Sequence, residues 1–157
     1  MTSTDSPPQF HPRTSHYRQR VEDSFNRQQA MQTLGISLDR VAPGEVDLGL
    51  PYQFELSQQH GFIHAGVIAT ALDSACGYAA FSLMAEDAAV LTVEFKISLL
   101  APAQGERFVA LGRVVKPGRT ITFAHGEAWA QRGDERKLIA QMNATLMAVV
   151  GRDEIRG

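Results

Sequence analysis

A single carboxylate, Asp73, interrupts the apolar stretch HGFIHAGVIATALDSACGYAAF, which runs from His60 to Phe81. If this stretch is a helix, the neighbours of Asp73 at three, four and seven residues are all small: Gly66, Ala69, Thr70, Cys76, Gly77 and Ala80. An unpaired buried carboxylate costs on the order of several kcal/mol. Asp73 is therefore expected to face a slender ligand or a second helix. The alternative is a structural carboxylate, bonded to a hydroxyl or an amide across a dimer contact.

The turn before this helix could supply the other half of a reactive site. His64, Ala65 and Gly66 place small residues where the helix is expected to begin, and unpaired N–H groups at a helix start can bind an anionic oxygen. Two turns later comes the Asp73 carboxylate. Hydrolysis of a thioester needs at least a hydrogen-bond donor for the oxyanion and a base or nucleophile. The thiolate leaves without much assistance from an acid.

The elements that must position these groups can be read from the hydrophobic pattern. Apolar residues at four-residue steps predict a surface helix from His16 to Leu34, which Gly35 ends. ISLDRV and EVDLGL, joined by an Ala-Pro-Gly turn, predict two short strands. A loop is expected over residues 51–63, and the long apolar helix over about residues 64–84.

The pattern then changes to a period of two. In VLTVEFKISLL the odd positions are apolar and the even ones polar, which predicts a half-buried strand with one apolar face: Leu91, Val93, Phe95, Ile97 and Leu99. Three more turn-linked strands follow and predict an antiparallel meander of four. The helix around Asp73 is too apolar to face water on any side, so the predicted class is α+β, with a curved antiparallel sheet wrapped around one long central helix.

Composition narrows the functional classes. The 157 residues are 44% hydrophobic and 20% charged, which predicts one domain at residues 16–150 between flexible tails at 1–15 and 151–157. A net charge of -2 argues against nucleic acid as a partner. The lone cysteine allows no internal disulfide, and neither a secretory signal nor about 20 uninterrupted apolar residues is present. A cytoplasmic protein without membrane contact is expected.

The His-Ala-Gly turn, the helix and Asp73 together resemble hotdog-fold acyl-CoA thioesterases of the 4-hydroxybenzoyl-CoA and PaaI-like type. The family pattern is a His-Gly-Gly turn, a helix, and an acidic residue seven positions after the second glycine; here Ala65 replaces the middle glycine, and its backbone N–H survives. Gln58 stands six residues before the histidine, where family members carry Asn or Gln. LTVEFKISLLAPAQGE and GRVVKPGRTITFAHGEAWA are also similar to the family, so the resemblance covers about residues 35–149.

The resemblance implies hydrolysis of acyl-CoA with a medium-chain or aryl acyl group, and no cofactor, because coenzyme A belongs to the substrate. Asp73 would act as general base or nucleophile, the Ala65 and Gly66 N–H groups as the oxyanion hole, His64 as the residue that shapes the turn, and Gln58 as an amide that orients water or the thioester. The family forms homodimers, commonly paired into tetramers. Asp73 of one chain would then reach a thioester held at the N–H groups of its partner.

Other polar residues have weaker claims. Thr70 and Gly77 would line the substrate site on the small-residue stripe. A cluster at one turn could hold the phosphates of coenzyme A, with solvated surface charges as the alternative: Arg113, Lys116, Arg119, Thr120 and, more remotely, Lys96. His60 and His64 lack a third ligand, so no metal is expected. A hotdog dehydratase or hydratase, which would pair a catalytic His with the acid, and a non-catalytic acyl-CoA-binding module are the competing functions.

Overall fold

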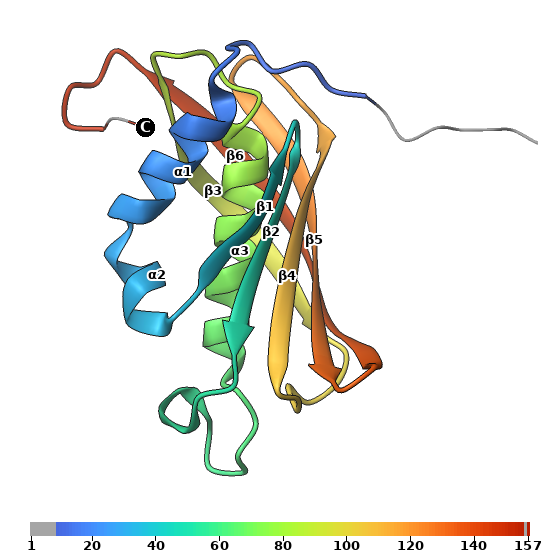
Figure 1. The fold of residues 1–157 in the computed structure, drawn as a ribbon. Helices are drawn as coiled ribbons and strands as arrows, with labels where there is room; N and C mark the ends of the chain where they lie inside the picture. The colour runs from blue at the N-terminus through green and yellow to red at the C-terminus, as the bar shows by residue number, and fades with distance from the viewer. Residues whose placement is uncertain (1–8, 156) are drawn as a thin grey trace, which may run out of the picture.

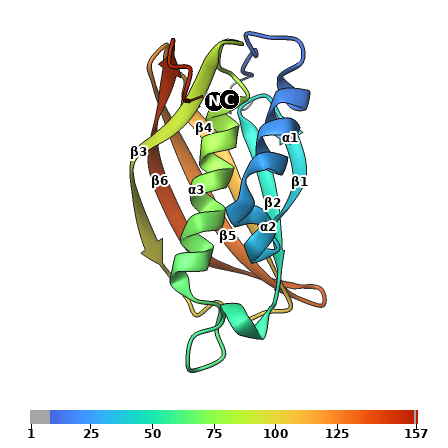
Figure 2. The ribbon, with the colours of Figure 1, turned by 90° about the vertical axis from the view of Figure 1, so that its left-hand side faces the viewer.

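A curved sheet wraps around one helix in the computed structural model, which describes residues 9–155 and 157 (Figures 1 and 2). The elements in chain order are α1 (Tyr17–Arg27), α2 (Gln29–Leu34), β1 (Ser37–Ala42), β2 (Glu45–Pro51), a 3-10 turn (Phe54–Leu56), α3 (Ala65–Phe81), β3 (Ala88–Leu99), β4 (Arg107–Lys116), β5 (Ile121–Arg132) and β6 (Glu135–Val150). All six strands pair antiparallel. The predicted α+β class and the central helix are confirmed.

The predicted surface helix is two helices. Gln28 adopts an extended conformation with φ -80° and ψ 98°, and this residue separates α1 from α2. Phe25 and Met31 are both buried, although six residues of continuous helix would turn their side chains about 120° apart. The break at Gln28 lets both side chains reach the core. Gly35 ends α2 in the left-handed region at φ 68°, as its position predicted.

The strand order differs from the predicted meander. The sheet runs β1-β2-β4-β5-β6-β3, so β3 pairs with β6 at one edge, and β4 pairs with β2. This order carries the sheet around α3, because the chain passes from one edge, β3, to the centre of the sheet at β4. Figure 2 shows α3 between the α1–α2 pair on one side and β3 on the other.

The helix lies very close to the middle of the sheet. A Cβ atom on Gly112 of β4 would lie 2.2 Å from the Ala75 carbonyl oxygen, and one on Gly126 of β5 would lie 3.0 Å from Cys76 Sγ. At Gly112, where the neighbouring atoms belong to the α3 backbone, only glycine permits this approach. Cys76 therefore packs against the sheet, and its predicted place on the open stripe was wrong. Its burial raises the thiol pKa to about 12, so the thiol is unreactive.

The apolar residues of β3 do not share one buried face. A bulge between Thr92 and Glu94 shifts the register, so Leu91 lies opposite Met147 and Phe95 opposite Ala144. Because pairing alternates between faces, Leu91 is on the other side of the sheet from Phe95. Leu91, Phe95 and Leu99 are exposed, and the predicted half-burial of this strand is wrong for the single chain.

The remaining boundaries agree with the sequence. The hairpin β1–β2 turns at Ala42, Pro43 and Gly44, and α3 begins one residue after the predicted start and ends three residues early. Residues 1–8 of the predicted tail lie outside the described residues, while Phe10 packs against the core. No helix in residues 9–155 is long and apolar enough to cross a membrane.

The contact between α3 and β4 yields a stability prediction. Gly112→Ala should lower the free energy of unfolding by about 1–3 kcal/mol, because the added methyl group collides with backbone atoms that cannot rotate away. Gly77→Ala is the matched control: an added Cβ meets nothing within 4 Å there, and alanine favours a helix by up to about 1 kcal/mol over glycine. Urea unfolding of the two variants measures the difference. Equal destabilisation would contradict the close contact.

Candidate active site

The start of α3 presents one free backbone donor. His64 is the N-cap residue, and its ring Nδ1 accepts a hydrogen bond of 2.9 Å from the Gly66 N–H. That N–H is therefore already engaged. For the Ala65 N–H, the described part of the chain supplies no acceptor. Of the two donors expected here, only that of Ala65 is left for an anionic oxygen, and the helix dipole adds to its attraction.

Asp73 is half-buried on α3, and its side chain has one hydrogen-bond partner among the described residues. The Thr92 hydroxyl donates a hydrogen bond of 2.8 Å to Asp73 Oδ1. Two effects act on the carboxyl group: burial raises its pKa above the ordinary value, and the bond from Thr92 partly opposes this rise by stabilising the ionised form. Burial is the larger effect. The site thus holds a carboxylate that is more basic than an exposed one.

Thr92 is a site residue that the sequence did not reveal. In strict alternation it would be one of the polar positions of β3, on the face opposite Phe95. The bulge after it changes this: Thr92 lies opposite Leu146, which is fully buried beneath α3. The bulge therefore turns the hydroxyl toward Asp73. A one-residue bulge leaves no signal in a single sequence, so the contact could not be anticipated.

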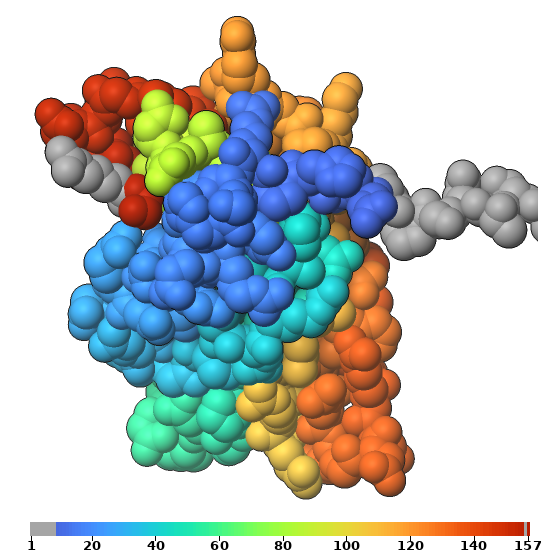
Figure 3. Space-filling model, turned by 45° about the horizontal axis from the view of Figure 1, so that its top comes forward, coloured from blue at the N-terminus to red at the C-terminus, as the bar shows by residue number. Residues whose placement is uncertain are grey.

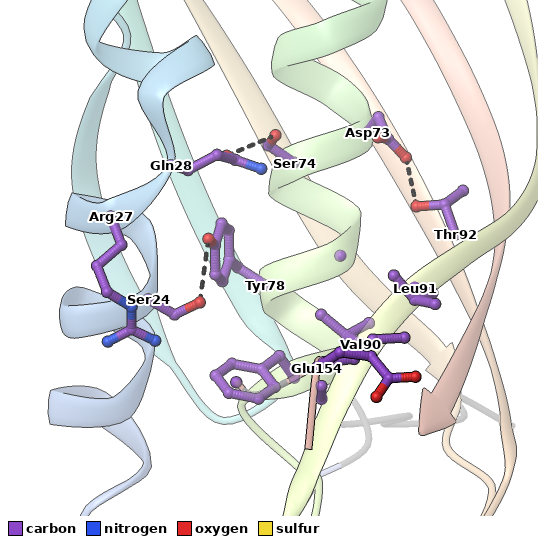
Figure 4. Close-up of a pocket in the computed structure, with 15 residues that line it drawn as sticks. Ser24, Arg27, Gln28, Asp73, Ser74, Tyr78, Val90, Leu91, Thr92 and Glu154 are labelled. Atoms are coloured by element: carbon purple, nitrogen blue, oxygen red, sulfur yellow. Dashed lines mark hydrogen bonds between the residues drawn. The ribbon is translucent and has the colours of Figure 1, made fainter. Parts of the chain in front are cut away.

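A cleft of about 390 Å³ contains this pair. Asp73 and Thr92 lie on the β3 side of α3, while the α1–α2 wall of the cleft carries Ser24, Arg27 and Gln28 (Figure 4). Gly77 also lines the cleft, and the absence of its side chain keeps the space open. The volume is at the lower end of the range for ligand sites, about 300–1,000 Å³. The cleft is therefore large enough for a small ligand or for one part of a larger one.

Of the two predicted oxyanion residues, Ala65 lies in a different cavity from Asp73, and Gly66 lines neither cavity. Gln58, His64 and Ala65 line a pocket of about 560 Å³ together with Leu99 and Leu100. The Gln58 side-chain oxygen accepts from the His60 N–H, which places the amide within the loop before α3. Thr70, between the two cavities, donates its hydroxyl to the Gly66 carbonyl at 2.8 Å and lines neither. Within one chain, the structure does not bring Asp73 and the helix start together.

The predicted phosphate-binding residues are dispersed. Arg113 forms an ion pair of 2.7 Å with Asp47 and donates to backbone carbonyls, so its charge is already used in the sheet. Lys116, Arg119 and Thr120 lie at the turn between β4 and β5, near the C-terminal end of α3 (Figure 1). Lys96 pairs with Asn143 on the outer face of the sheet. None of them lines the Asp73 cleft.

Two absences complete the description of the site. In the part of the chain that the structure describes, no three His, Cys, Asp or Glu residues gather as a metal site would require. Likewise, the described residues that line the Asp73 cleft include no histidine. Among the described residues that line this cleft, the carboxylates are Asp73 and Glu154, and Glu154 lies at the far end of the cleft.

The bond between Thr92 and Asp73 predicts how the carboxyl group titrates. Thr92→Val removes the donor that favours the ionised form, so the pKa of Asp73 should rise further above its ordinary value. Thr92→Ser keeps a hydroxyl and should leave the pKa near that of the unmodified protein. Carbon NMR of the Asp73 carboxyl group across a pH titration measures both. An unchanged pKa in the valine variant would exclude this hydrogen bond.

Comparison with known proteins identifies the family of the chain. The profile of the thioesterase superfamily matches residues 60–137, which include the turn, α3, Asp73 and Thr92. A protein of Halobacterium salinarum that carries a provisional esterase name is 34% identical over 96 residues, and the match spans 63% of its length. The medium/long-chain acyl-CoA thioesterase YigI of Escherichia coli is 28% identical over 138 residues, with 78% of this chain and 84% of YigI covered.

Solved structures agree with these sequence matches. A thioesterase family protein from Silicibacter pomeroyi is 60% identical, has a TM-score of 0.85, and covers 86% of this chain and 99% of its own. The PaaI protein from the phenylacetic acid degradation operon of E. coli has a TM-score of 0.78 at 19% identity, covering 87% of this chain and 96% of its own, which shows the hotdog fold alone. The predicted fold and resemblance are confirmed: the chain belongs to the thioesterase superfamily.

Proposed function

We propose that the protein hydrolyses acyl-CoA thioesters and that Asp73 is its general base or nucleophile. The observation that carries the proposal is a half-buried carboxylate with a raised pKa, held by Thr92 in a cleft that fits an acyl group. Membership of the thioesterase superfamily and the similarity to YigI support a CoA thioester as the substrate. The proposed acyl group is medium-chain or aryl, in keeping with the cleft volume.

The chemistry follows from these groups. As a general base, Asp73 accepts a proton from water while the water oxygen bonds to the thioester carbonyl carbon. As a nucleophile, the carboxylate itself bonds to that carbon, and water later hydrolyses the resulting anhydride. In both routes the carbonyl oxygen becomes an oxyanion that needs an N–H donor, and the C–S bond then breaks to release the CoA thiolate. A base with a raised pKa accepts the proton more readily than an ordinary aspartate.

The distance along α3 requires a second chain. Ala65 and Asp73 are eight residues apart, which is ~12 Å along a helix axis. Both groups must come within about 3 Å of one thioester, so the Ala65 N–H and Asp73 of one chain cannot serve the same substrate. We infer a homodimer in which Ala65 of the partner subunit faces Asp73; assembly of dimers into a tetramer is part of the same proposal.

The edge of the sheet supports a dimer of this kind. The outer edge of β3 has no neighbouring strand within residues 9–155, and its N–H and C=O groups are free to pair with another strand. Phe95 is 45% exposed and Leu99 is 58% exposed, on the face that looks toward α3. Covering them would bury apolar surface. A second copy placed along β3 would bring its own helix start toward the Asp73 cleft.

Replacement of Asp73 tests the proposed chemistry. Asp73→Asn should lower turnover of acyl-CoAs by about 100- to 10,000-fold, because the amide can neither accept the proton nor attack. A free-thiol release assay with acyl-CoAs from acetyl to palmitoyl, plus benzoyl and phenylacetyl, measures the rate and the acyl preference. Near-normal turnover in the variant would remove Asp73 from the mechanism. If the wild-type protein cleaves none of these thioesters, the protein is instead an acyl-CoA-binding module or an enzyme of another chemistry.

The same variant has a stability signature that shows whether it is folded. Because burial raises the pKa of Asp73, the ionised form is disfavoured in the folded protein. Asp73→Asn should therefore raise the Tm at neutral pH. On acidification the folded wild-type protein takes up its proton at a higher pH than the unfolded chain, so the difference in Tm should shrink through that range. A variant less stable than wild type at pH 7 would contradict the desolvation argument.

Complementation tests whether the site is shared between chains. Ala65→Pro removes the proposed donor at the first residue of the helix, where proline is well tolerated, and His64 already has the extended conformation that precedes proline. Ala65→Ser, which keeps the N–H, is the control. Proline and Asp73→Asn variants should each be inactive alone. When the two variants are mixed, half of the randomly formed dimers contain one chain of each, and one of the two sites in such a dimer is intact, so about a quarter of wild-type activity should return. No recovery would place both groups in one chain.

A further inference from the structure

The wall of the Asp73 cleft formed by α1 and α2 is polar. Two side-chain pairs join this wall to α3: the Ser74 hydroxyl donates to the Gln28 side-chain oxygen at 3.4 Å, and the Ser24 and Tyr78 hydroxyls share a hydrogen bond of 3.3 Å (Figure 4). All four residues line the cleft that holds Asp73. An acyl group that enters beside Asp73 therefore meets hydrogen-bonding groups instead of an apolar tunnel.

Some hydrogen-bond donors on this wall have no acceptor among the described residues. The Gln28 side-chain oxygen accepts the hydrogen bond from Ser74. The amide nitrogen of Gln28 carries two hydrogens, for which the described residues offer no acceptor, and Figure 4 shows this nitrogen turned toward α3. Two hydroxyls that share one bond also leave one O–H free, and Tyr78 is only 6% exposed. Ser24 and Gln28 are half-buried, so solvent can pair with these donors in the open cleft, but an apolar group that displaced the solvent would leave them unpaired, which is costly. An oxygen atom on the ligand would satisfy them.

Charge around the cleft favours a neutral oxygen over a carboxylate. Arg27 lies on the α1 wall and is exposed, so its attraction for an anion is weakened by solvent. Two carboxylates, Asp73 and Glu154, line the same cleft and would repel a second negative charge. The net effect is a wall suited to hydroxyl or keto oxygen.

The position of this wall along α3 sets the distance from the reacting carbon. Tyr78 follows Asp73 by five residues, which is ~7.5 Å along the helix axis. Because the bonds of an extended acyl chain zigzag, each bond of about 1.5 Å advances the chain by less than its length, and roughly six bonds cover this distance. The favoured oxygen would thus lie near the end of a medium-length chain.

We propose that the Ser24–Tyr78 pair, assisted by Gln28 on the same wall, selects acyl-CoAs whose acyl group carries a neutral oxygen roughly six bonds from the thioester carbonyl carbon. This proposal rests on the thioesterase function and narrows its substrate class. Gln28 is available for the role because it is the extended residue at the break between α1 and α2. The same break that buries Met31 turns this amide toward the cleft.

The test compares two substrates of equal length. In 6-hydroxyhexanoyl-CoA a hydroxyl group replaces the terminal methyl group of heptanoyl-CoA, and the two acyl groups are otherwise alike. Wild-type kcat/KM should favour the hydroxyl substrate by about 10-fold or more, since one satisfied donor is worth roughly that factor. Gln28→Leu and Tyr78→Phe should each reduce the preference, whereas Gln29→Leu, at an exposed position outside the cleft, should leave it unchanged.

The outcomes separate this inference from the function on which it rests. Loss of the preference in Gln28→Leu, with the preference intact in Gln29→Leu, would support the assignment. Equal cleavage of the two substrates by wild type, or a preference that survives in both cleft variants, would overturn it while leaving the thioesterase function in place. If the wild-type protein cleaves neither substrate faster than the Asp73→Asn variant does, the proposed specificity is refuted. The free-thiol assay with the full acyl-CoA panel then decides separately whether the protein is a thioesterase.

Discussion

The close packing of α3 against the centre of the sheet is the contact on which the site depends. Gly112 has no side chain, so the backbone of α3 approaches β4 to a distance that no other residue would allow, and Gly126 leaves room on β5 for the Cys76 side chain. The sheet can then curl around the helix and cover most of its surface. The sheet leaves one side of α3 uncovered, between β3 and the α1–α2 pair, and there Asp73 and Gly77 line the cleft.

On this side of α3 the protein balances two electrostatic effects on one carboxyl group. Full exposure would give Asp73 an ordinary pKa, and full burial without a partner would leave it protonated at neutral pH. Half-burial raises the pKa, and the Thr92 hydroxyl limits the rise. The bulge in β3 is what supplies this hydroxyl, because without the change of register Thr92 would face away from α3. A local irregularity of the edge strand thus tunes the proposed base.

The sequence predicted those features that depend on local pattern. The apolar stretch predicted α3, and period-two alternation predicted β3, whereas the catalytic role of Asp73 stays a prediction. Features that depend on distant contacts were missed: the pairing of β3 with β6, the bulge at Thr92, and the place of Cys76 against Gly126. The break at Gln28 was missed for a related reason, since it arises from the need to bury Met31 as well as Phe25. Four-residue spacing alone is satisfied by a continuous helix.

A straight helix explains why the proposed site needs two chains. Its start supplies the backbone donor, and the carboxylate must lie further along, where desolvation can raise its pKa. Those requirements separate the groups by ~12 Å on one axis, and no rotamer closes such a gap. A second helix beside the first, running in the opposite direction, removes the conflict, because each start then lies near the middle of the other. The exposed edge of β3 is the feature of this fold that can hold two helices in that relation.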